Sequence, residues 1–322
     1  MRAGPTRVVV TGAGIAVRGL GSPAELLAGG PADPAAPDPV DSLTGRGLRY
    51  KDRATRLGMV AARAALADAG LLEVVTPATP DDSFGVVTSS NFGNLDTVCQ
   101  TVRTIDEHTY LGTSPMMLPA TSSNVTASWL AITHGLRGAN VTLCNGPTSG
   151  LDAVRWARLL ITAGRVTRVL VVGVEPDLPE VRHVVDDGGG ALFDGAAAIV
   201  LERDDLPATT GTGIRAGIGR YAKCRRAVDA IDAVSPRTGR IGLRLGPGES
   251  AVDAEVCDLA SALPPASGAL GVLQVAAATA WLRGGSRTGP ALAVCGDDRT
   301  TAALVVAEAA ASLSDSDLME LT

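Results

Sequence analysis

The sequence lacks paired cysteines, an excess of positive charge and long apolar runs, and each absence excludes a class of protein. A chain of 322 residues is too long to need disulfides, and its cysteines form no CxxC pair, so a reducing compartment is expected. The 28 basic residues are outnumbered by 34 acidic ones, so no nucleic-acid partner is expected. The five cysteines are Cys99, Cys144, Cys224, Cys257 and Cys295.

No stretch of the sequence suits a membrane. A spanning helix needs about 18 consecutive apolar residues, and no run reaches that length. The apolar run at residues 8–10 turns at Gly12 and is too short for the core of a signal peptide. Hydrophobic residues make up 46% of the chain and charged ones 19%, which is enough apolar surface for a globule. We therefore expect a cytoplasmic protein with no membrane partner.

Short runs of Val, Ile and Leu alternate with longer Ala-rich amphipathic stretches, which is typical of buried strands covered by helices on both faces. The predicted fold class is therefore α/β. Helices are predicted over residues 53–69 and 148–163, because each stretch ends at a glycine that suits a helix terminus. The predicted strands are residues 7–11, 85–88, 140–143, 168–173, 196–202, 214–221, 241–245, 291–295 and 302–307.

These strands fall into two sets, which indicates two similar halves. A polar loop at residues 203–212 separates the sets and divides the chain into an N-terminal half, 1–205, and a C-terminal half, 206–322. The second half is shortened. Where a full helix is expected between Cys224 and Ile241, only residues 225–231 have a helical pattern.

The opening Val-Val-Val-Thr-Gly-Ala-Gly-Ile has the strand and glycines of a dinucleotide-binding loop. The third glycine of that fingerprint is absent, because Val17 takes its place, and no acidic residue follows at the spacing of a ribose contact. Nucleotide binding is therefore not favoured, and no cofactor or metal is expected.

Several segments together, in the same order along the chain, resemble the β-ketoacyl synthases of the thiolase superfamily. The resemblance implies a thiolase-like layered αβαβα fold built from two pseudo-duplicated halves, the second of them shortened here. The matching segments are residues 8–15, 65–71, 85–88, 135–142, 148–153, 195–202 and, more weakly, 266–268.

The catalytic positions of that family are altered in this chain. The family places a cysteine nucleophile on a turn before a helix, and the matching Thr-Ser-Gly-Leu-Asp-Ala puts Pro147 at its position. Proline has no nucleophile, and it also lacks the backbone N–H that serves the family's oxyanion hole. As a structural residue, Pro147 suits the first turn of a helix.

The two histidines that the family uses for decarboxylation are also missing. The first position matches Leu245 and the second lies near Ala262. His108, His134 and His183 lie outside the matched stretches and are interpreted as surface or turn residues. The family's glycine-rich gating loop reads Cys-Gly-Asp-Asp-Arg-Thr at residues 295–300, and its two carboxylates would oppose a forming oxyanion.

A ketosynthase-like chain without these groups resembles a chain-length factor of a type II polyketide synthase. The resemblance implies a non-catalytic subunit that pairs with a catalytic ketosynthase, shapes the acyl tunnel and meets the acyl carrier protein through the complex. A polyene-type system is preferred to an aromatic one. The candidate residues for the tunnel and the dimer interface are Met116, Met117, Leu118 and Thr121.

Three other interpretations remain open. Cys144, three residues before Pro147, could serve as a displaced nucleophile in an active acyltransferase or condensing enzyme. A decarboxylase that makes starter units would need the two missing histidines. A purely structural homodimer would be stable without a partner.

Overall fold

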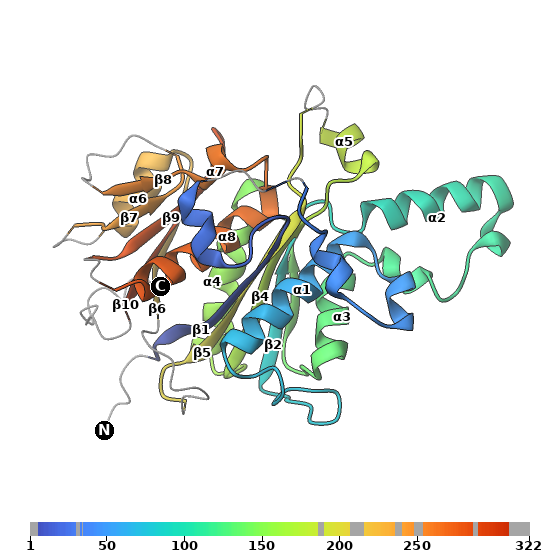
Figure 1. Cartoon of the computed structure of the whole chain (residues 1–322), viewed down its shortest axis with the longest axis horizontal. Helices are drawn as coiled ribbons and strands as arrows, with labels where there is room; N and C mark the ends of the chain where they lie inside the picture. The colour runs from blue at the N-terminus through green and yellow to red at the C-terminus, as the bar shows by residue number, and fades with distance from the viewer. Residues whose placement is uncertain are drawn as a thin grey trace.

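The ten strands of the computed structural model form one sheet whose order is nearly symmetric about its centre (Figure 1). The structure describes residues 6–29, 33, 35–185, 190–206, 216–235, 240–247, 254–285 and 289–308. The strand order is β3-β2-β4-β5-β1-β6-β10-β9-β7-β8. The strands are β1 (Val8–Val17), β2 (Phe84–Ser89), β3 (Asn140–Leu143), β4 (Arg168–Glu175), β5 (Gly195–Arg203), β6 (Ala216–Cys224), β7 (Leu243–Leu245), β8 (Glu255–Cys257), β9 (Ala291–Gly296) and β10 (Thr301–Glu308).

Each half of the chain contributes five strands with the same pairing pattern. In the first half β2 pairs parallel with β3 and β4, and β5 pairs antiparallel with β4 and β1. In the second half β7 pairs parallel with β8 and β9, and β10 pairs antiparallel with β9 and β6. The halves join through β1 and β6, which pair antiparallel; among the described residues Val9 lies opposite Gly217 and Val10 opposite Ala216.

The expected thiolase-like αβαβα fold is confirmed, with corrections to individual elements. The short edge strand β8 was not predicted, because its three residues are too few to show a pattern. The predicted turn at Gly12 is wrong, because β1 continues through it to Val17, and β6 extends to Cys224, beyond the predicted end at residue 221. The division of the chain at residue 205 stays a prediction, since residues 207–215 lie outside the described part.

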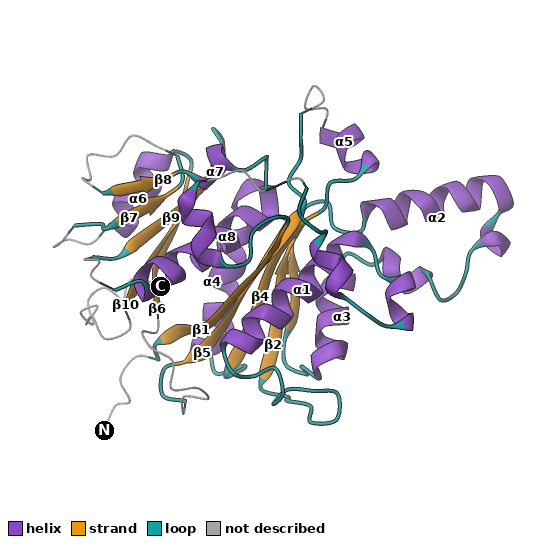
Figure 2. Ribbon diagram, in the orientation of Figure 1, coloured by secondary structure: helices purple, strands orange, loops and turns teal. Residues whose placement is uncertain are grey.

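Two helices form the central layer, between the strands of the first half and those of the second (Figure 2). They are α4 (Ser149–Thr162) and α8 (Ser267–Arg283), and nearly every residue of α8 is buried. The remaining helices are α1 (Arg53–Asp68), α2 (Leu95–His108), α3 (Val125–His134), α5 (Pro179–Val185), α6 (Ala227–Val234) and α7 (Leu259–Ala262). In the described residues no helix is both long and apolar enough to span a membrane.

The two glycines that resemble a dinucleotide loop are required for packing. A Cβ on Gly12 would lie 2.2 Å from the carbonyl oxygen of Ala65, and one on Gly14 would lie 2.5 Å from the nitrogen of the same residue, both on α1. The backbone N–H of Ala13, between them, donates to Asp68 at 2.8 Å. These glycines let α1 lie directly on β1, which accounts for the motif without a nucleotide.

The crossing of α4 and α8 is close enough to admit only glycine. A Cβ on Gly150 would lie 2.7 Å from the backbone nitrogen of Gly271, and one on Gly271 would lie 2.4 Å from that of Leu151. Neither contact can be relieved by a flexible side chain. The starts of the two central helices are therefore held together by backbone contact.

Replacing Gly150 by alanine tests this crossing. We expect Gly150→Ala to lower the free energy of unfolding by about 1–3 kcal/mol, because the added methyl group forces the two backbones apart. Gly21→Ala is the control, since its Cβ would meet only a carboxylate oxygen of Glu25, at 3.3 Å. Urea denaturation of the three proteins measures the effect. Equal stability of Gly150→Ala and the control would contradict the close crossing.

Candidate functional site

The turn between β3 and α4 is where the resemblance places the nucleophile. After β3, Cys144 and Asn145 lead into a 3-10 turn, Gly146–Thr148, that continues directly into α4. Gly146 has a φ of +75°, in the left-handed region that favours glycine. Pro147 follows within this turn, as a proline at the start of a helix. It offers neither a nucleophilic side chain nor a backbone donor.

Asn91, just after β2, fixes this turn. Its side-chain amide donates to the carbonyl of Gly146 at 2.9 Å and to the hydroxyl of Ser267 at 2.6 Å. Its side-chain oxygen accepts from the N–H of Gly146 at 3.0 Å and from the hydroxyl of Ser149 at 3.2 Å. Asn91 therefore ties the start of α4 to the start of α8, where Ser267 has an unusual φ of +36°.

Glu175, at the end of β4, is a buried carboxyl group that holds Asn91 in turn. It accepts from the backbone N–H groups of Asn91 at 2.7 Å, Phe92 at 3.2 Å and Gly268 at 2.9 Å. Burial raises the pKa of Glu175 to about 7, and these hydrogen bonds offset only part of that effect. The carboxyl group that organises the site therefore titrates near neutral pH.

Cys144 has surroundings that suppress its reactivity. Its thiol donates to the carbonyl oxygen of Asn91 at 3.7 Å. Desolvation and then the negative charge of Glu175 raise the pKa of the Cys144 thiol. Since the thiolate is the nucleophile, this environment disfavours a displaced nucleophile.

The three histidines lie on other elements. His134 ends α3 and is buried rather than at the surface, and burial lowers its pKa to about 4. His108 ends α2, and His183 lies on α5. In the described part of the chain, none of them hydrogen-bonds to the turn that holds Pro147. Nor does any group of three or more His, Cys, Asp and Glu side chains gather there in a way that could hold a metal ion.

The other altered positions are also unsuited to condensation. Leu245 is fully buried at the end of β7, and Ala262 is exposed at the end of α7. In the turn between β9 and β10, the side chain of Asp297 accepts from the backbone N–H groups of Arg299 and Thr300, each at 2.9 Å. Two donors that this turn could offer an oxyanion are thus already bound to a carboxylate.

Comparisons with known proteins assign the family. The family described as "Beta-ketoacyl synthase, N-terminal domain" matches residues 33–197, about half of the chain. The chain belongs to the β-ketoacyl synthase family. It is 35% identical to polyketide β-ketoacyl synthase 2 of Streptomyces virginiae over 162 residues, and 31% identical to the tetracenomycin polyketide synthase ketoacyl synthase beta subunit of Streptomyces glaucescens over 147 residues.

These matches cover 48% and 44% of this chain, and only 37% and 34% of the two relatives. Among solved structures, the ishigamide ketosynthase/chain length factor superposes with a TM-score of 0.72 at 22% identity. That superposition covers 94% of this chain and 99% of the other. The sequences therefore assign the family, and the superposition shows that the ketosynthase fold extends over nearly the whole chain.

The predicted tunnel segment connects α2 to α3 on a projection from this ketosynthase fold (Figure 1). Met116 is 68% exposed and Leu118 is 44% exposed, whereas Met117 is half-buried and lines a cavity of about 170 Å³ with Leu118. Thr121 is half-buried and donates to the carbonyl oxygen of Leu118 at 2.8 Å. Met117, Leu118 and Thr121 thus lie together and Met116 is exposed to solvent, and the role of the four residues stays a prediction.

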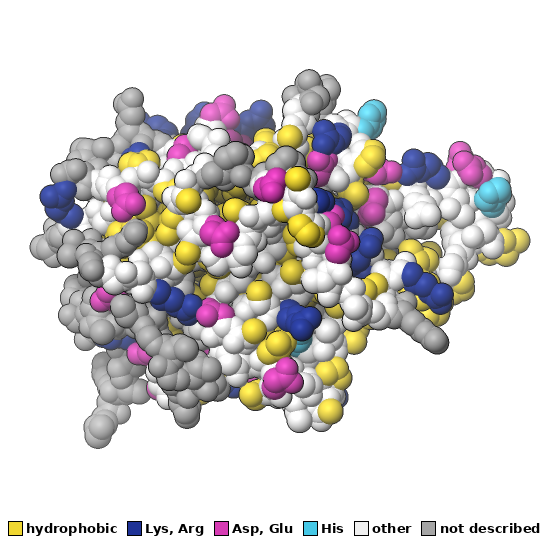
Figure 3. Space-filling view, in the orientation of Figure 1, with side chains coloured by type: hydrophobic (Ala, Val, Ile, Leu, Met, Phe, Trp, Pro, Cys, Tyr) yellow, Lys and Arg dark blue, Asp and Glu magenta, His cyan; other side chains and the backbone are white. Residues whose placement is uncertain are grey.

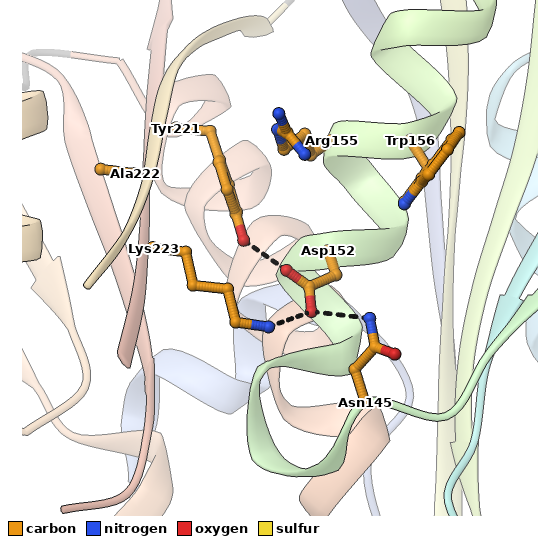
Figure 4. A pocket seen from close by; sticks show the side chains of 7 residues that line it. All are labelled: Asn145, Asp152, Arg155, Trp156, Tyr221, Ala222 and Lys223. Carbon is orange, nitrogen blue, oxygen red and sulfur yellow. Dashed lines mark hydrogen bonds and ion pairs between the residues drawn. The ribbon is translucent and has the colours of Figure 1, made fainter. Parts of the chain in front are cut away.

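A second cavity, of about 350 Å³, lies between α4 and β6 (Figure 4). Its centre is Asp152, whose carboxylate accepts from Lys223 at 2.9 Å, from Asn145 at 3.1 Å and from the hydroxyl of Tyr221. The hydrogen bonds that Asp152 accepts hold its pKa below the usual range despite burial. The cavity is also lined by Arg155, Trp156 and Ala222.

The sequence analysis missed Asn91, Glu175 and the Tyr221–Lys223 pair. A signal for the first two exists, since both stand at or just beyond the C-terminal ends of buried parallel strands, β2 and β4. Sites in α/β proteins gather at that edge. Tyr221 and Lys223 carry no such signal, because their contact with Asp152 joins residues about 70 positions apart.

The pH dependence of stability tests the role of Glu175. Its pKa rises from 4.5 in the unfolded chain to about 7 in the folded one, so the folded state binds more protons in this range. The stabilisation of the folded state by the protonated Glu175 carboxyl group is complete below pH 4.5 and is lost as the pH rises through 7. We expect the stability of the natural chain, relative to Glu175→Gln, to fall by about 3 kcal/mol between pH 4.5 and 7.5.

Urea denaturation of both proteins across this pH range measures the difference. Glu255→Gln, at an exposed position on β8, serves as the control for a lost carboxyl group. A pH-independent difference between the natural chain and Glu175→Gln would show that Glu175 does not titrate in this range.

Proposed function

We propose that this chain is a non-catalytic chain-length factor, which pairs with a catalytic ketosynthase subunit in type II polyketide biosynthesis. The observation that carries the proposal is Pro147, in the turn that leads into α4. The hydrogen bonds of Asn91 and Glu175 still hold the starts of the central helices in place around it. A fold maintained without its nucleophile indicates a role other than condensation. The likeness to the ishigamide ketosynthase/chain length factor supports this interpretation.

The edge of the sheet at β3 is the proposed place of pairing. Among the described residues β3 pairs with β2 alone, so its other side presents backbone groups that no described strand pairs with. The helices α3 and α4 pack against β3, and each carries a large exposed apolar side chain: Ile132 of α3 is 61% exposed, and Trp156 of α4 is 44% exposed. An edge strand between two apolar faces fits a partner of the same fold, whose own edge strand would continue the sheet.

The projection that carries α2 adds a second apolar surface. Figure 3 shows hydrophobic side chains at its tip and along its lower side. Surfaces of this kind on one element mark protein contacts. The exposed apolar residues of this surface are Val102, Ile105, Tyr110, Leu111, Met116 and Leu118. We propose that this surface reaches the partner's pocket and that Met116 and Met117 help to set the space for the acyl chain, with the acyl carrier protein bound through the complex.

Purification of the tagged chain from its native host tests the pairing. We expect a 1:1 complex with a ketosynthase-like chain that carries a cysteine and two histidines at the catalytic positions. Ile132→Asp and Trp156→Asp should each weaken this complex at least about tenfold, because a charge would be buried in the interface. Val228→Asp, at an exposed apolar position on α6, is the control. A stable homodimer with no such partner would overturn the proposal.

Substitution of Met117 tests the tunnel assignment in the reconstituted complex. Met117→Phe should shift products to shorter chains, because the larger ring takes up space, and Met117→Ala should shift them to longer ones. Condensation itself should continue with both variants. Met59→Ala, at a half-buried position on α1, is the matched control. The readout is the distribution of product lengths by mass spectrometry, and an unchanged distribution with both Met117 variants would count against the assignment.

A further inference from the structure

Two half-buried arginines on one side of α4 carry positive charge that the described part of the chain does not neutralise. Arg155 and Arg158 lie one turn apart on α4. The guanidinium of Arg155 lies 5.2 Å from the centre of the Tyr221 ring, and no described carboxylate forms an ion pair with either arginine. Burial lowers the pKa of Arg158, and the charge of Arg155 lowers it further. Like charges at this spacing destabilise a helix unless an anion compensates them.

Asp152 cannot supply that compensation. Its carboxylate already accepts from Tyr221, Lys223, Asn145 and the hydroxyl of Thr148, so both oxygens are occupied. Figure 4 shows Tyr221, Lys223 and Asn145 converging on Asp152, with Arg155 lying apart from them. Lys223 balances the charge of Asp152, which leaves Arg155 as a net positive charge in the lining of a cavity of about 350 Å³, with Arg158 one turn further along α4.

The cavity extends from β6, in the middle of the strand order, to the turn that follows the edge strand β3. Asn145, which lines it, stands two residues after the end of β3, and α4 packs against one face of that strand. Trp156, also in the lining, is half exposed. When two chains of one fold pair edge to edge about a two-fold axis, corresponding surfaces meet. The α4 face of this chain would then lie opposite the corresponding helix of its partner.

We propose that the cavity between Arg155 and Lys223 receives an acidic side chain of the catalytic subunit, and that the same arginines oppose pairing between two copies of this chain. The inference rests on the proposed function and names what its partner must carry. Two identical copies would bring their Arg155 and Arg158 toward each other without a compensating carboxylate. A partner with acidic residues at the corresponding helix would gain charge-assisted hydrogen bonds instead. The same charges thus favour pairing with the catalytic subunit and disfavour pairing between two copies of this chain.

Reversing the charge of Arg155 and Arg158 tests whether they contribute to binding of the catalytic subunit. In the purified complex, the double variant Arg155→Glu with Arg158→Glu should raise the dissociation constant at least about tenfold in about 50 mM salt. The difference should shrink in about 500 mM salt, where exposed charges are screened. The control is Arg7→Glu with Arg63→Glu, which makes the same change of net charge at two exposed positions and should stay within about twofold of the natural chain. Circular dichroism confirms that each variant is folded.

Equal affinity of the natural chain and the α4 variant would overturn the inference while leaving the proposed function intact. If the natural chain itself binds no catalytic subunit, the proposed function fails and the inference fails with it. Stabilisation of the isolated natural chain by inorganic phosphate, lost in the α4 variant, with no effect of that variant on pairing, would identify a small-anion site and contradict an acidic partner residue.

A mixture of two forms of this chain tests whether the arginines oppose pairing between two identical copies. The natural chain and the α4 double variant carry opposite charges on this helix, so their equimolar mixture should form a dimer at low salt that neither forms alone. Analytical ultracentrifugation measures the association. A natural chain that dimerises by itself at low salt, or a mixture no more associated than its components, would contradict the proposed repulsion.

Discussion

The meeting of α4 and α8 is the contact on which the rest of the structure depends. Their backbones touch at Gly150 and Gly271, and Asn91 and Glu175 bridge their first turns with hydrogen bonds. In a layered fold, the central helices pack against the strands of both halves, so the position of one helix relative to the other constrains where the strands lie. The surroundings of Pro147 follow from this arrangement, because the turn that contains it is held on one side by α4 and on the other by Asn91.

The turn between β3 and α4 keeps its hydrogen-bonded backbone although it has no nucleophile at the position that the family resemblance marks. The turn that would present a nucleophile keeps its glycine, its hydrogen bonds and its entry into a helix, yet it contains Pro147. The nearby thiol of Cys144 is held in a form that resists ionisation. In this turn Pro147 removes a side-chain nucleophile and a backbone N–H, while Gly146 and Asn91 still fix the path of the chain.

Much of the fold could be predicted from the sequence, because buried strands and long helices leave strong patterns. Helices α1 and α4 and nine of the strands were predicted near their observed places. The role of the glycines in the first strand became clear only from the structure, in which α1 lies directly on them. The edge strand β8 could not be predicted, since three residues carry no period. Pro147 was recognised because it interrupts a matched motif. Asn91 and Lys223 were not, because their importance arises from contacts across the fold and not from local spacing.

The place of β1 in the middle of the strand order has a consequence for how the sheet forms. β1 is the first strand of the chain, yet it pairs with β5, so that Val8 lies opposite Arg203. Pairing strands this far apart in the sequence carries a large loop-closure entropy, which slows folding. The middle of the sheet therefore depends on contacts between segments that are distant along the chain.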